Sequence, residues 1–496
     1  MRFTPRRLAA ACLAAAALAL AACAVNPATG RRQFMLMSES QEISMGRQAD
    51  AEIVQTYGLY DDPKLAAYVD SVGQRMALLS DRPGLEFTFR VLDSPVINAF
   101  ALPGGYVYIT RGILAHMNDE AELAMVIGHE IGHVTARHGA EQYTKQQLAG
   151  LGLGLGSLFV PQVARFGQLA ETALGLLFLK YSRDDESQAD ELGVRYATRA
   201  GFDPTEGVSF FHVLDRMSQE SGQSLPSWLS THPAPGDRVQ RTAELARAAK
   251  EEHPDASRVG AGAHLARVDG VVFGDDPRQG FVEGGLFKHP ELRFQIEFPS
   301  GWKVQNTPGA VTAGEPRQQA VMQLTMEKSD GLGPHQYATR VATSAGATIA
   351  EGSAEDIHGA EAYVALLQVP SDAGSTTPVL AAFVRRKPGG PIYQVVAQAA
   401  QGAFRTYRDD FLRSMRSLRD LTDPQALAME PNRVAVQTIR SRTTLALAVG
   451  QATSPVRASV VALLNDLQPE SSLAAGSKLK LVRGTYRPPG DVGGGS

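Results

Sequence analysis

Two histidines and a glutamate stand at a spacing that suits metal-dependent catalysis. The run His129-Glu130-Ile131-Gly132-His133 follows the pattern HExxH, and we expect it on a helix. Four residues make about one helical turn, so both imidazoles project from one face toward a single ion, with Glu130 beside them as a candidate base. The apolar surroundings argue against two histidines that only line a solvated helix face. We therefore predict a metal site at His129 and His133.

A catalytic zinc site takes three protein ligands and keeps one position open. A metzincin places its third histidine six residues after the motif, but that residue is Gly139, and His138 is out of register by one. The segment 186–190 offers another candidate, because Glu186 and Asp190 lie one turn apart on a second predicted helix. We expect Glu186 to be the third ligand. Asp190 would accept a hydrogen bond from the other ring N–H of a ligand histidine.

Both cysteines of the chain, Cys12 and Cys23, lie within its first 23 residues. A disulfide framework, cysteine-ligated zinc, an iron–sulfur cluster and a cysteine nucleophile are therefore excluded from the rest of the chain. Any metal must be held by histidine, aspartate or glutamate.

The first 22 residues have a basic start and an apolar stretch from 8 to 22, the layout of a secretory signal peptide. This stretch is too short to span a membrane comfortably. The sequence Leu-Ala-Ala-Cys at 20–23 resembles the bacterial lipobox, in which cleavage leaves Cys23 as the lipidated N-terminus. Ala24 in the next position resembles lipoproteins sent to the outer membrane. The alternative is an ordinary cleaved signal that ends near a chance cysteine.

The elements that position these residues form several domains. A chain of 496 residues suggests about three domains. The formal net charge is −4, or −7 once the three arginines of the signal are removed, which argues against nucleic-acid binding.

We expect a multidomain protein with a mainly α zincin-type peptidase domain that carries a small β-sheet, then an α+β sheet domain and a small βααβ module. The boundaries we predict are a signal peptide at 1–22, a lipidated cysteine and polar tether at 23–41, the peptidase domain at 42–250, a linker at 251–269, the α+β domain at 270–421, a linker at 422–431, the βααβ module at 432–484 and a disordered tail at 485–496.

Within the peptidase domain, apolar residues recur at helical spacing over 42–80, and β-rich runs occur at 87–92, 96–102 and 106–110. Asp119 and Glu122 form a capping box that opens the HExxH helix, which we expect to run through about His138. A helix at about 183–200 and further helices to about 250 complete the domain. The glycine-dotted apolar stretch within 145–180 predicts a mobile or membrane-facing flap, with a transmembrane hairpin as the alternative.

The C-terminal half changes to alternating strands, expected at 292–298, 320–326, 362–367 and 392–397, and closes with an amphipathic helix at 404–418. The run Phe-Pro-Ser-Gly-Trp at 298–302 is similar to the start of PsbP/Mog1-like domains. Residues 432–484 resemble a LysM module in their strand, helix, helix, strand order. The usual Gly-Asp-Thr-Leu is replaced by Arg-Thr-Thr-Leu at 442–445, which puts glycan binding in doubt.

Four features occur in an order that identifies a family resemblance. They are Asn-Ala-Phe-Ala-Leu-Pro-Gly-Gly at 98–105, the HExxH helix, the Glu-x-x-Ala-Asp helix, and Thr-His-Pro at 231–233 followed by Arg238. Together they resemble the gluzincin metallopeptidase family that includes the CAAX prenyl proteases, HtpX and the BepA-type periplasmic quality-control proteases. The resemblance covers about residues 40–245. The multi-span helices of the first two members and an evident tetratricopeptide array are missing, so the chain resembles the soluble, lipid-anchored branch.

The resemblance implies one Zn²⁺ per chain held by His129, His133 and Glu186, which would lower the pKa of water to roughly 7. Glu130 would take the proton of that water and pass it to the leaving amine. His232 and Arg238 would lie across the cleft and stabilise the oxyanion, and His232 could also cap the open zinc position as an inhibitory switch. The strand with Asn98, Ala99 and Phe100 would pair with the substrate backbone and so show little sequence preference.

The expected function is a zinc metalloendopeptidase that cleaves misfolded or unassembled envelope proteins in the bacterial periplasm, anchored by Cys23 to the membrane, with the outer membrane favoured. The alternative is an envelope chaperone or scaffold lipoprotein with a mostly latent metal site. The expected partners are protein or peptide substrates, the membrane and, through the C-terminal domains, peptidoglycan or envelope assembly proteins. We expect no nucleic-acid partner.

Overall fold

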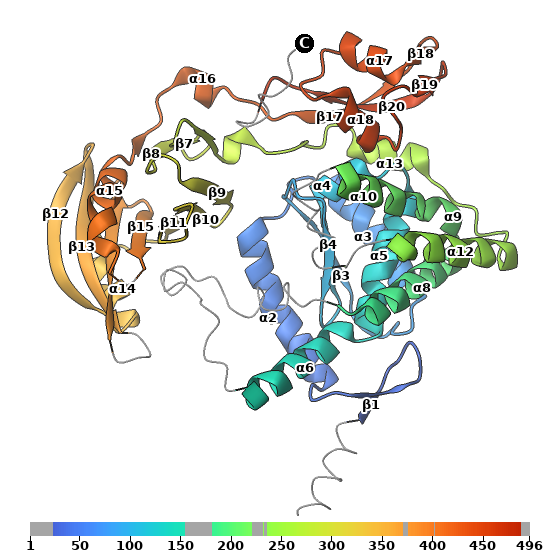
Figure 1. Cartoon of the computed structure of the whole chain (residues 1–496), viewed down its shortest axis with the longest axis horizontal. Helices are drawn as coiled ribbons and strands as arrows, with labels where there is room; N and C mark the ends of the chain where they lie inside the picture. Colours follow the sequence, from blue (N-terminus) through green and yellow to red (C-terminus); the bar gives the residue numbers. More distant parts are fainter. Residues whose placement is uncertain are drawn as a thin grey trace, which may run out of the picture.

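The structure is a computed structural model, which describes residues 23–153, 181–220, 232, 236–370, 375–400 and 402–487. Figure 1 shows a helical part around a small sheet, a sheet-rich part beside it and a small module above the helices. The three-stranded sheet has the order β3-β5-β4, with β3 parallel and β4 antiparallel to the central β5. Its strands fall within the predicted runs and span Thr88–Leu92 (β3), Ala99–Leu102 (β4) and Tyr106–Thr110 (β5).

Helices surround this sheet and account for the rest of the described peptidase region. The long predicted helical stretch at 42–80 is two helices, broken at Gly58, whose φ is +69°. The helices are α2 (Glu39–Tyr57), α3 (Pro63–Ala77), α4 (Arg111–His116), α5 (Glu120–Thr135), α6 (His138–Leu153), α8 (Arg183–Arg199), α9 (Pro204–Gly207), α10 (Ser209–Glu220), α12 (Gly236–Glu252) and α13 (Ala261–Val268).

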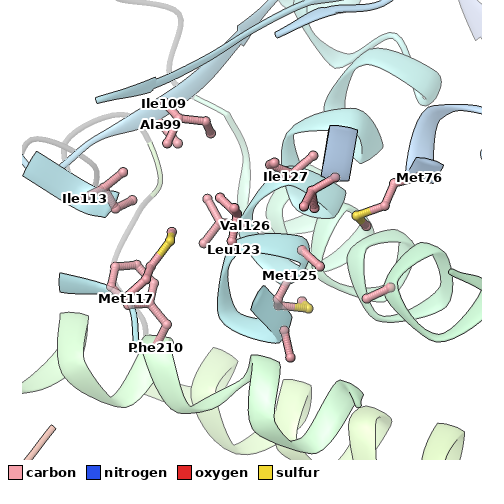
Figure 2. Packing of buried hydrophobic residues seen from close by; sticks show 14 of the residues in the cluster. Met76, Ala99, Ile109, Ile113, Met117, Leu123, Met125, Val126, Ile127 and Phe210 are labelled. Carbon is pink, nitrogen blue, oxygen red and sulfur yellow. The ribbon is translucent and has the colours of Figure 1, made fainter. Parts of the chain in front are cut away.

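The HExxH helix, α5, is the centre of the core, because every one of its residues is buried. A helix that is buried on all sides lies inside its domain, so its polar residues must be satisfied by neighbouring groups. Asp119 caps its start by accepting a hydrogen bond from the backbone N–H of Glu122 at 2.9 Å. Figure 2 shows Leu123, Val126 and other α5 residues packed among apolar side chains of neighbouring elements.

The predicted end of this helix at about His138 was wrong by three residues. Helix α5 ends at Thr135, and Arg137 adopts φ +59°, in the left-handed region that reverses the chain direction. Helix α6 then begins at His138. The side chain of Arg137 stabilises the reversal, since it donates to Glu42 at 2.8 Å and to the carbonyl of Met37 at 3.0 Å.

Two segments expected to be loose connections are ordered against the peptidase. The tether forms a hairpin of β1 (Cys23–Val25) and β2 (Arg32–Phe34), and Asn26 donates to the carbonyl of Ala136 at 3.1 Å. The linker contains α13, whose Val268 lies in the peptidase core. The predicted flap lies mostly outside the described residues, because the structure describes α6 only to Leu153 and resumes at Tyr181. Among the described residues, no helix is long and apolar enough to cross a membrane.

The α+β part has a seven-stranded antiparallel sheet, ordered β12-β13-β14-β15-β11-β10-β9, and a four-stranded sheet, ordered β16-β8-β7-β6. The predicted strands correspond to β8, β11, β13 and β15, and the predicted closing helix is α15. Its elements are η2 (Pro277–Gln279), β6 (Phe281–Glu283), β7 (Leu286–His289), β8 (Phe294–Glu297), β9 (Lys303–Thr307), β10 (Ala310–Gly314), β11 (Ala320–Glu327), α14 (Pro334–Ser344), β12 (Thr348–Ile357), β13 (Ala360–Pro370), β14 (Thr376–Arg385), β15 (Ile392–Ala399), α15 (Phe404–Arg416) and β16 (Arg419–Asp420).

The C-terminal module, residues 432–484, has the predicted order of strand, helix, helix, strand, with two short additional strands. Its outer strands β17 and β20 pair antiparallel. The elements from residue 424 onward are α16 (Pro424–Leu427), β17 (Arg433–Thr438), β18 (Thr443–Thr444), α17 (Leu445–Gln451), α18 (Ala458–Leu464), β19 (Ser472–Leu473) and β20 (Lys478–Arg483).

A buried histidine in α13 makes the stability of this fold depend on pH. His264 is fully buried, and burial lowers its pKa to about 3, with Lys480 nearby acting in the same direction. Below the ordinary histidine pKa of about 6.5, His264 is protonated in the unfolded chain but stays neutral in the folded chain. The free energy of unfolding therefore falls by about 1.4 kcal/mol for each pH unit below 6.5. His264→Gln is expected to flatten the fall of the unfolding free energy between pH 6.5 and 5, measured by urea unfolding. The exposed His253→Gln should leave that slope unchanged, and equal slopes in both variants would contradict the prediction.

Candidate metal centre

The predicted ligands meet at one point together with His232. One ligand atom from each of His129, His133, Glu186 and His232 lies within 4.8 Å of all the others, and all four residues are buried. The Nε2 atoms of His129 and His133 are 3.0 Å apart, and the carboxylate of Glu186 lies 3.5 Å from His133 Nε2 and 3.6 Å from His129 Nε2. Tetrahedral zinc with bonds of about 2.0–2.2 Å separates its ligand atoms by about 3.3 Å. Two imidazoles and a carboxylate at this spacing fit zinc.

Close packing of α5 against α8 brings Glu186 and Asp190 to the HExxH motif. Gly128 of α5 and Gly193 of α8 face each other, since a Cβ added to Gly128 would lie 3.0 Å from the carbonyl oxygen of Gly193. Two side-chain-free positions let the helix axes approach at this point. The start of α8 is fixed by a capping box between Ser182 and Asp185. The register of Glu186 on the first turn of α8 follows from that cap.

A carboxylate fixes the ring of His129, as the sequence predicted for Asp190. His129 Nδ1 lies 2.9 Å from Asp190 Oδ1, and a donating Nδ1–H leaves the lone pair of Nε2 for a metal. Arg238 donates to both oxygens of Asp190 at 2.8 and 2.9 Å, and its Nη1 lies 2.7 Å from Glu186. Burial alone would raise the pKa of Asp190, but hydrogen bonds from His129 and Arg238 hold it well below its ordinary value. Asp190 therefore stays ionised.

A second chain of hydrogen bonds fixes the ring of His133, and it passes through His138. Nδ1 of His138 lies 2.9 Å from Nδ1 of His133, while its Nε2 lies 2.8 Å from Gln188 Oε1. The amide oxygen of Gln188 can only accept, so His138 donates through Nε2 and accepts from His133 at Nδ1. That arrangement leaves the lone pair of His133 Nε2 directed at Glu186 and His129, as metal binding requires. This role of His138 was not predicted from the sequence.

Tyr181 is the other residue that sequence reasoning missed. Its ring stacks on His133 with centroids 4.0 Å apart and an interplanar angle of 22°. The only sequence signal was its place five residues before Glu186, which carries no chemistry by itself. Burial raises the pKa of the Tyr181 hydroxyl, so it stays protonated at neutral pH.

His232 occupies the side of the centre that faces Glu130 and strand β4. Its Nδ1 lies 2.9 Å from Glu186 Oε1 and 3.3 Å from His129 Nε2, and its Nε2 lies 3.5 Å from Glu130 Oε1. The backbone of Ala99 also forms a hydrogen bond with this imidazole. Burial lowers the pKa of His232 to about 4 and raises that of Glu186 to about 7. Both shifts favour the neutral groups, because burial outweighs the effect of neighbouring charges, which for Glu186 include the cationic Arg238.

The predicted substrate strand is the edge of the small sheet. Strand β4 pairs only with β5 among the described strands, and Ala99 at its start lies beside His232. Phe100 is buried and stacks on Tyr108 with centroids 4.7 Å apart, so its side chain belongs to the core. Asn98 precedes the strand; its carbonyl accepts from the backbone N–H of Thr110 at 3.1 Å, and its own N–H donates to Thr110 Oγ1 at 3.2 Å. What β4 offers a ligand is therefore its backbone edge.

Residues 63–246, which include this whole centre, match the profile of peptidase family M48. These residues form an M48 peptidase domain. The chain is 31% identical over 223 residues to the beta-barrel assembly-enhancing protease of Escherichia coli strain K12, a match that covers 43% of this chain and 45% of that protein. It is 32% identical over 224 residues to the mitochondrial metalloendopeptidase OMA1 of Schizosaccharomyces pombe, which covers 44% of this chain and 65% of that protein.

The chain thus spans less than two thirds of these relatives, and the matches leave more than half of the chain outside the M48 domain. Among solved structures, cyanobacterial PsbP of Synechocystis is similar at 15% identity with a TM-score of 0.24, covering 28% of this chain and 94% of that one. The PsbP/Mog1-like and LysM-like assignments stay predictions.

Proposed function

We propose that the protein is a zinc-dependent endopeptidase that hydrolyses peptide bonds of misfolded or unassembled cell-envelope proteins. The observation that carries this proposal is the convergence of His129, His133 and Glu186, which are held by Asp190, His138 and Arg238 respectively. The carboxylate of Glu130 lies beside them, 3.5 Å from His232 Nε2. The names of the relatives agree with it, since one is a beta-barrel assembly-enhancing protease and the other a metalloendopeptidase. A scaffold with a latent metal site would not require Glu130 to be buried at the centre.

The chain's own residues supply three contributions. His129, His133 and Glu186 would hold one zinc ion, which supplies Lewis-acid activation of water and of the scissile carbonyl. Glu130 accepts the proton of the attacking water and returns it to the leaving amine. Arg238 acts indirectly, because it is held on Asp190 and Glu186 and so keeps the carboxylates that orient the site in place. This position differs from the cleft-facing oxyanion role that the family resemblance suggested for Arg238.

Strand β4 would bind the substrate by adding a strand to the edge of the sheet. Such pairing reads backbone N–H and C=O groups, so it needs an extended, unfolded segment and tolerates many side chains. The proposed function is tested by comparing two forms of one substrate protein, native with its disulfides intact and reduced and carboxymethylated. We expect zinc-dependent cleavage of the unfolded form at many unrelated bonds and no cleavage of the native form. Equal cleavage of both forms, or one strictly preferred bond sequence, would count against backbone pairing.

His232 would act as a lid on the centre. With His232 as a fourth ligand the zinc site is closed, and catalytic zinc needs an open position. The same imidazole forms a hydrogen bond with the backbone of Ala99, a group that a bound substrate strand would use. His232→Ala is therefore expected to raise the cleavage rate of an unfolded substrate several-fold. A fall in rate would indicate that His232 stabilises the oxyanion instead, and an unchanged rate would remove it from both roles.

We also propose that Cys23 is lipidated and holds the protein to the membrane, with the outer membrane favoured, so that the peptidase faces the periplasm. The lipobox-like sequence before Cys23 supports this anchor. Cys23→Ser is expected to move the protein from the membrane fraction to the soluble fraction. The C-terminal domains would contact peptidoglycan or envelope assembly proteins.

A further inference from the structure

A lysine of the C-terminal module is buried inside the peptidase domain. Lys480 lies on β20 and has no exposed surface. Its Nζ donates to the carbonyl of Ala115 at 2.8 Å and to that of Met117 at 2.6 Å. Ala115 lies in the last turn of α4 and Met117 is its C-cap, so both carbonyls stand at the end of α4, where the short connection into the HExxH helix α5 begins.

Burying an ammonium group is unfavourable unless its donors and its charge are satisfied. Two of the three N–H donors of Lys480 are used by these carbonyls. Two buried acids at the start of α5, Asp119 and Glu122, provide opposite charge nearby. Burial lowers the pKa of Lys480 and raises that of Glu122, and each group opposes the shift of the other. A leucine or methionine would fill the same space at a smaller desolvation cost, so the contribution specific to lysine is the contact with this connection.

The module is docked by more than this one residue. Val434, Leu464 and Val482 of the module form a buried apolar cluster with Ala115. Arg216 of α10 donates to Asp466 at 3.1 Å and to the carbonyl of Leu467 at 2.8 Å. The strand that carries Lys480 is itself fixed, because Asn465 hydrogen bonds to both the N–H and the carbonyl of Lys480 at 2.8 Å. Figure 1 shows the module lying against α10 and α4.

The connection held by Lys480 sets where α5 begins, and therefore where its motif lies. Asp119 is the N-cap of α5, and Glu122 accepts from the backbone N–H of Asn118 at 2.5 Å. His129 follows Glu122 by seven residues, about two turns further along the same helix face. A displacement of the first turn of a rigid helix would move His129 and His133 with it.

We propose that the C-terminal module is an integral part of the peptidase, and that Lys480 is a positioning residue which holds the start of the HExxH helix. The activity part of this inference rests on the proposed endopeptidase function, whereas the positioning part does not. On this view, residues 432–484 serve the catalytic helix itself, in addition to any envelope partner they bind.

The test uses the full mature chain with three variants. Lys480→Met removes the donors at similar size, Lys480→Arg keeps donors and charge, and Lys478→Met alters an exposed lysine on the same strand as a matched control. Backbone hydrogen exchange over 112–126 and the cleavage of an unfolded peptide are measured on zinc-saturated protein well below its unfolding temperature. In Lys480→Met we expect exchange in this segment to accelerate roughly 10-fold or more, and kcat to fall about 10-fold with KM unchanged. Lys480→Arg should restore part of the exchange protection and part of kcat, and Lys478→Met should leave both quantities at their wild-type values.

The proposal is overturned if Lys480→Met shows exchange over 112–126 within twofold of Lys478→Met. A fall in global stability with no local change in exchange or kcat would give Lys480 an ordinary structural role and would also overturn it. If Lys480→Met does not fold, Asn465→Ala replaces it, and it should accelerate exchange in the same segment by loosening the strand around Lys480. If the wild-type chain cleaves nothing, the proposed function fails, while the exchange result still decides the role of Lys480.

Discussion

Glu130→Gln is expected to lower the rate of peptide cleavage by a factor of about 10²–10⁴ while zinc stays bound. Glutamine has nearly the size of glutamate, so the packing of this fully buried residue is retained. An amide cannot accept the proton of the attacking water or return it to the leaving amine. Zinc retention is expected because the ligand atoms come from His129, His133 and Glu186. The measurement is steady-state cleavage of an unfolded substrate together with the zinc content of the same preparation.

The matched control is Glu191→Gln, an exposed glutamate on α8 near the same centre. It should cleave at the wild-type rate. Cleavage by zinc-loaded Glu130→Gln at the rate of Glu191→Gln would rule out Glu130 as the base. The scaffold alternative would then regain support, because the metal would be present without the proton transfer that hydrolysis needs.

Arg238→Met is expected to destabilise the metal-free protein by about 3–5 kcal/mol, because the change leaves buried carboxylates without their cation. The guanidinium of Arg238 is itself largely buried and contacts both Asp190 and Glu186. Saturating zinc should restore part of the loss, since a bound cation also neutralises Glu186. Measuring the unfolding free energy once with a metal chelator and once with saturating zinc therefore separates the contribution of Arg238 from that of the bound zinc.

Arg241→Met serves as the control, since Arg241 is exposed on the same helix and a surface change of this kind usually alters stability by less than about 0.5 kcal/mol. Arg238→Lys, which keeps the charge but not the paired donors, should lie between the two. If Arg238→Met is as stable in chelator as Arg241→Met, the ion pairs with Asp190 and Glu186 do not hold the site together.

The candidate ligands could be proposed from the sequence because they fall in two pairs, and each pair lies on one helix. His129 and His133 lie one turn apart on α5, and Glu186 and Asp190 lie one turn apart on α8, so local periodicity was sufficient to put each pair on one face. That the two helices meet was inferred from chemistry, since two histidines needed a third ligand. The glycines that allow their close approach have no recognisable pattern in the sequence by themselves.

His138 could not be assigned, because its role depends on a reversal of the chain at Arg137. The sequence favours continuing the helix, which would direct His138 away from His133. The left-handed conformation of Arg137 ends α5 early, and its side chain is held by Glu42, which is almost a hundred residues away in the sequence. An interaction of this range leaves no periodic signal.

The role of Arg238 and the docking of the module depend on tertiary contacts in the same way. Nothing next to Arg238 in the sequence shows that it reaches Asp190 and Glu186. Lys480 stands in an alternation of lysines and leucines on a strand, where Lys478 is exposed and Lys480 is buried. Only the packing of the module against α4 distinguishes the two lysines.

The most direct measurement is a titration of zinc into the metal-free mature chain, with cleavage of an unfolded substrate followed at each addition. We expect cleavage to be absent without metal, to rise in proportion to bound zinc and to reach its maximum at one zinc per chain. His133→Ala should neither bind zinc at this stoichiometry nor regain cleavage. Cleavage that persists in the metal-free chain, or that is restored equally in His133→Ala, would contradict a zinc endopeptidase centred on His129, His133 and Glu186.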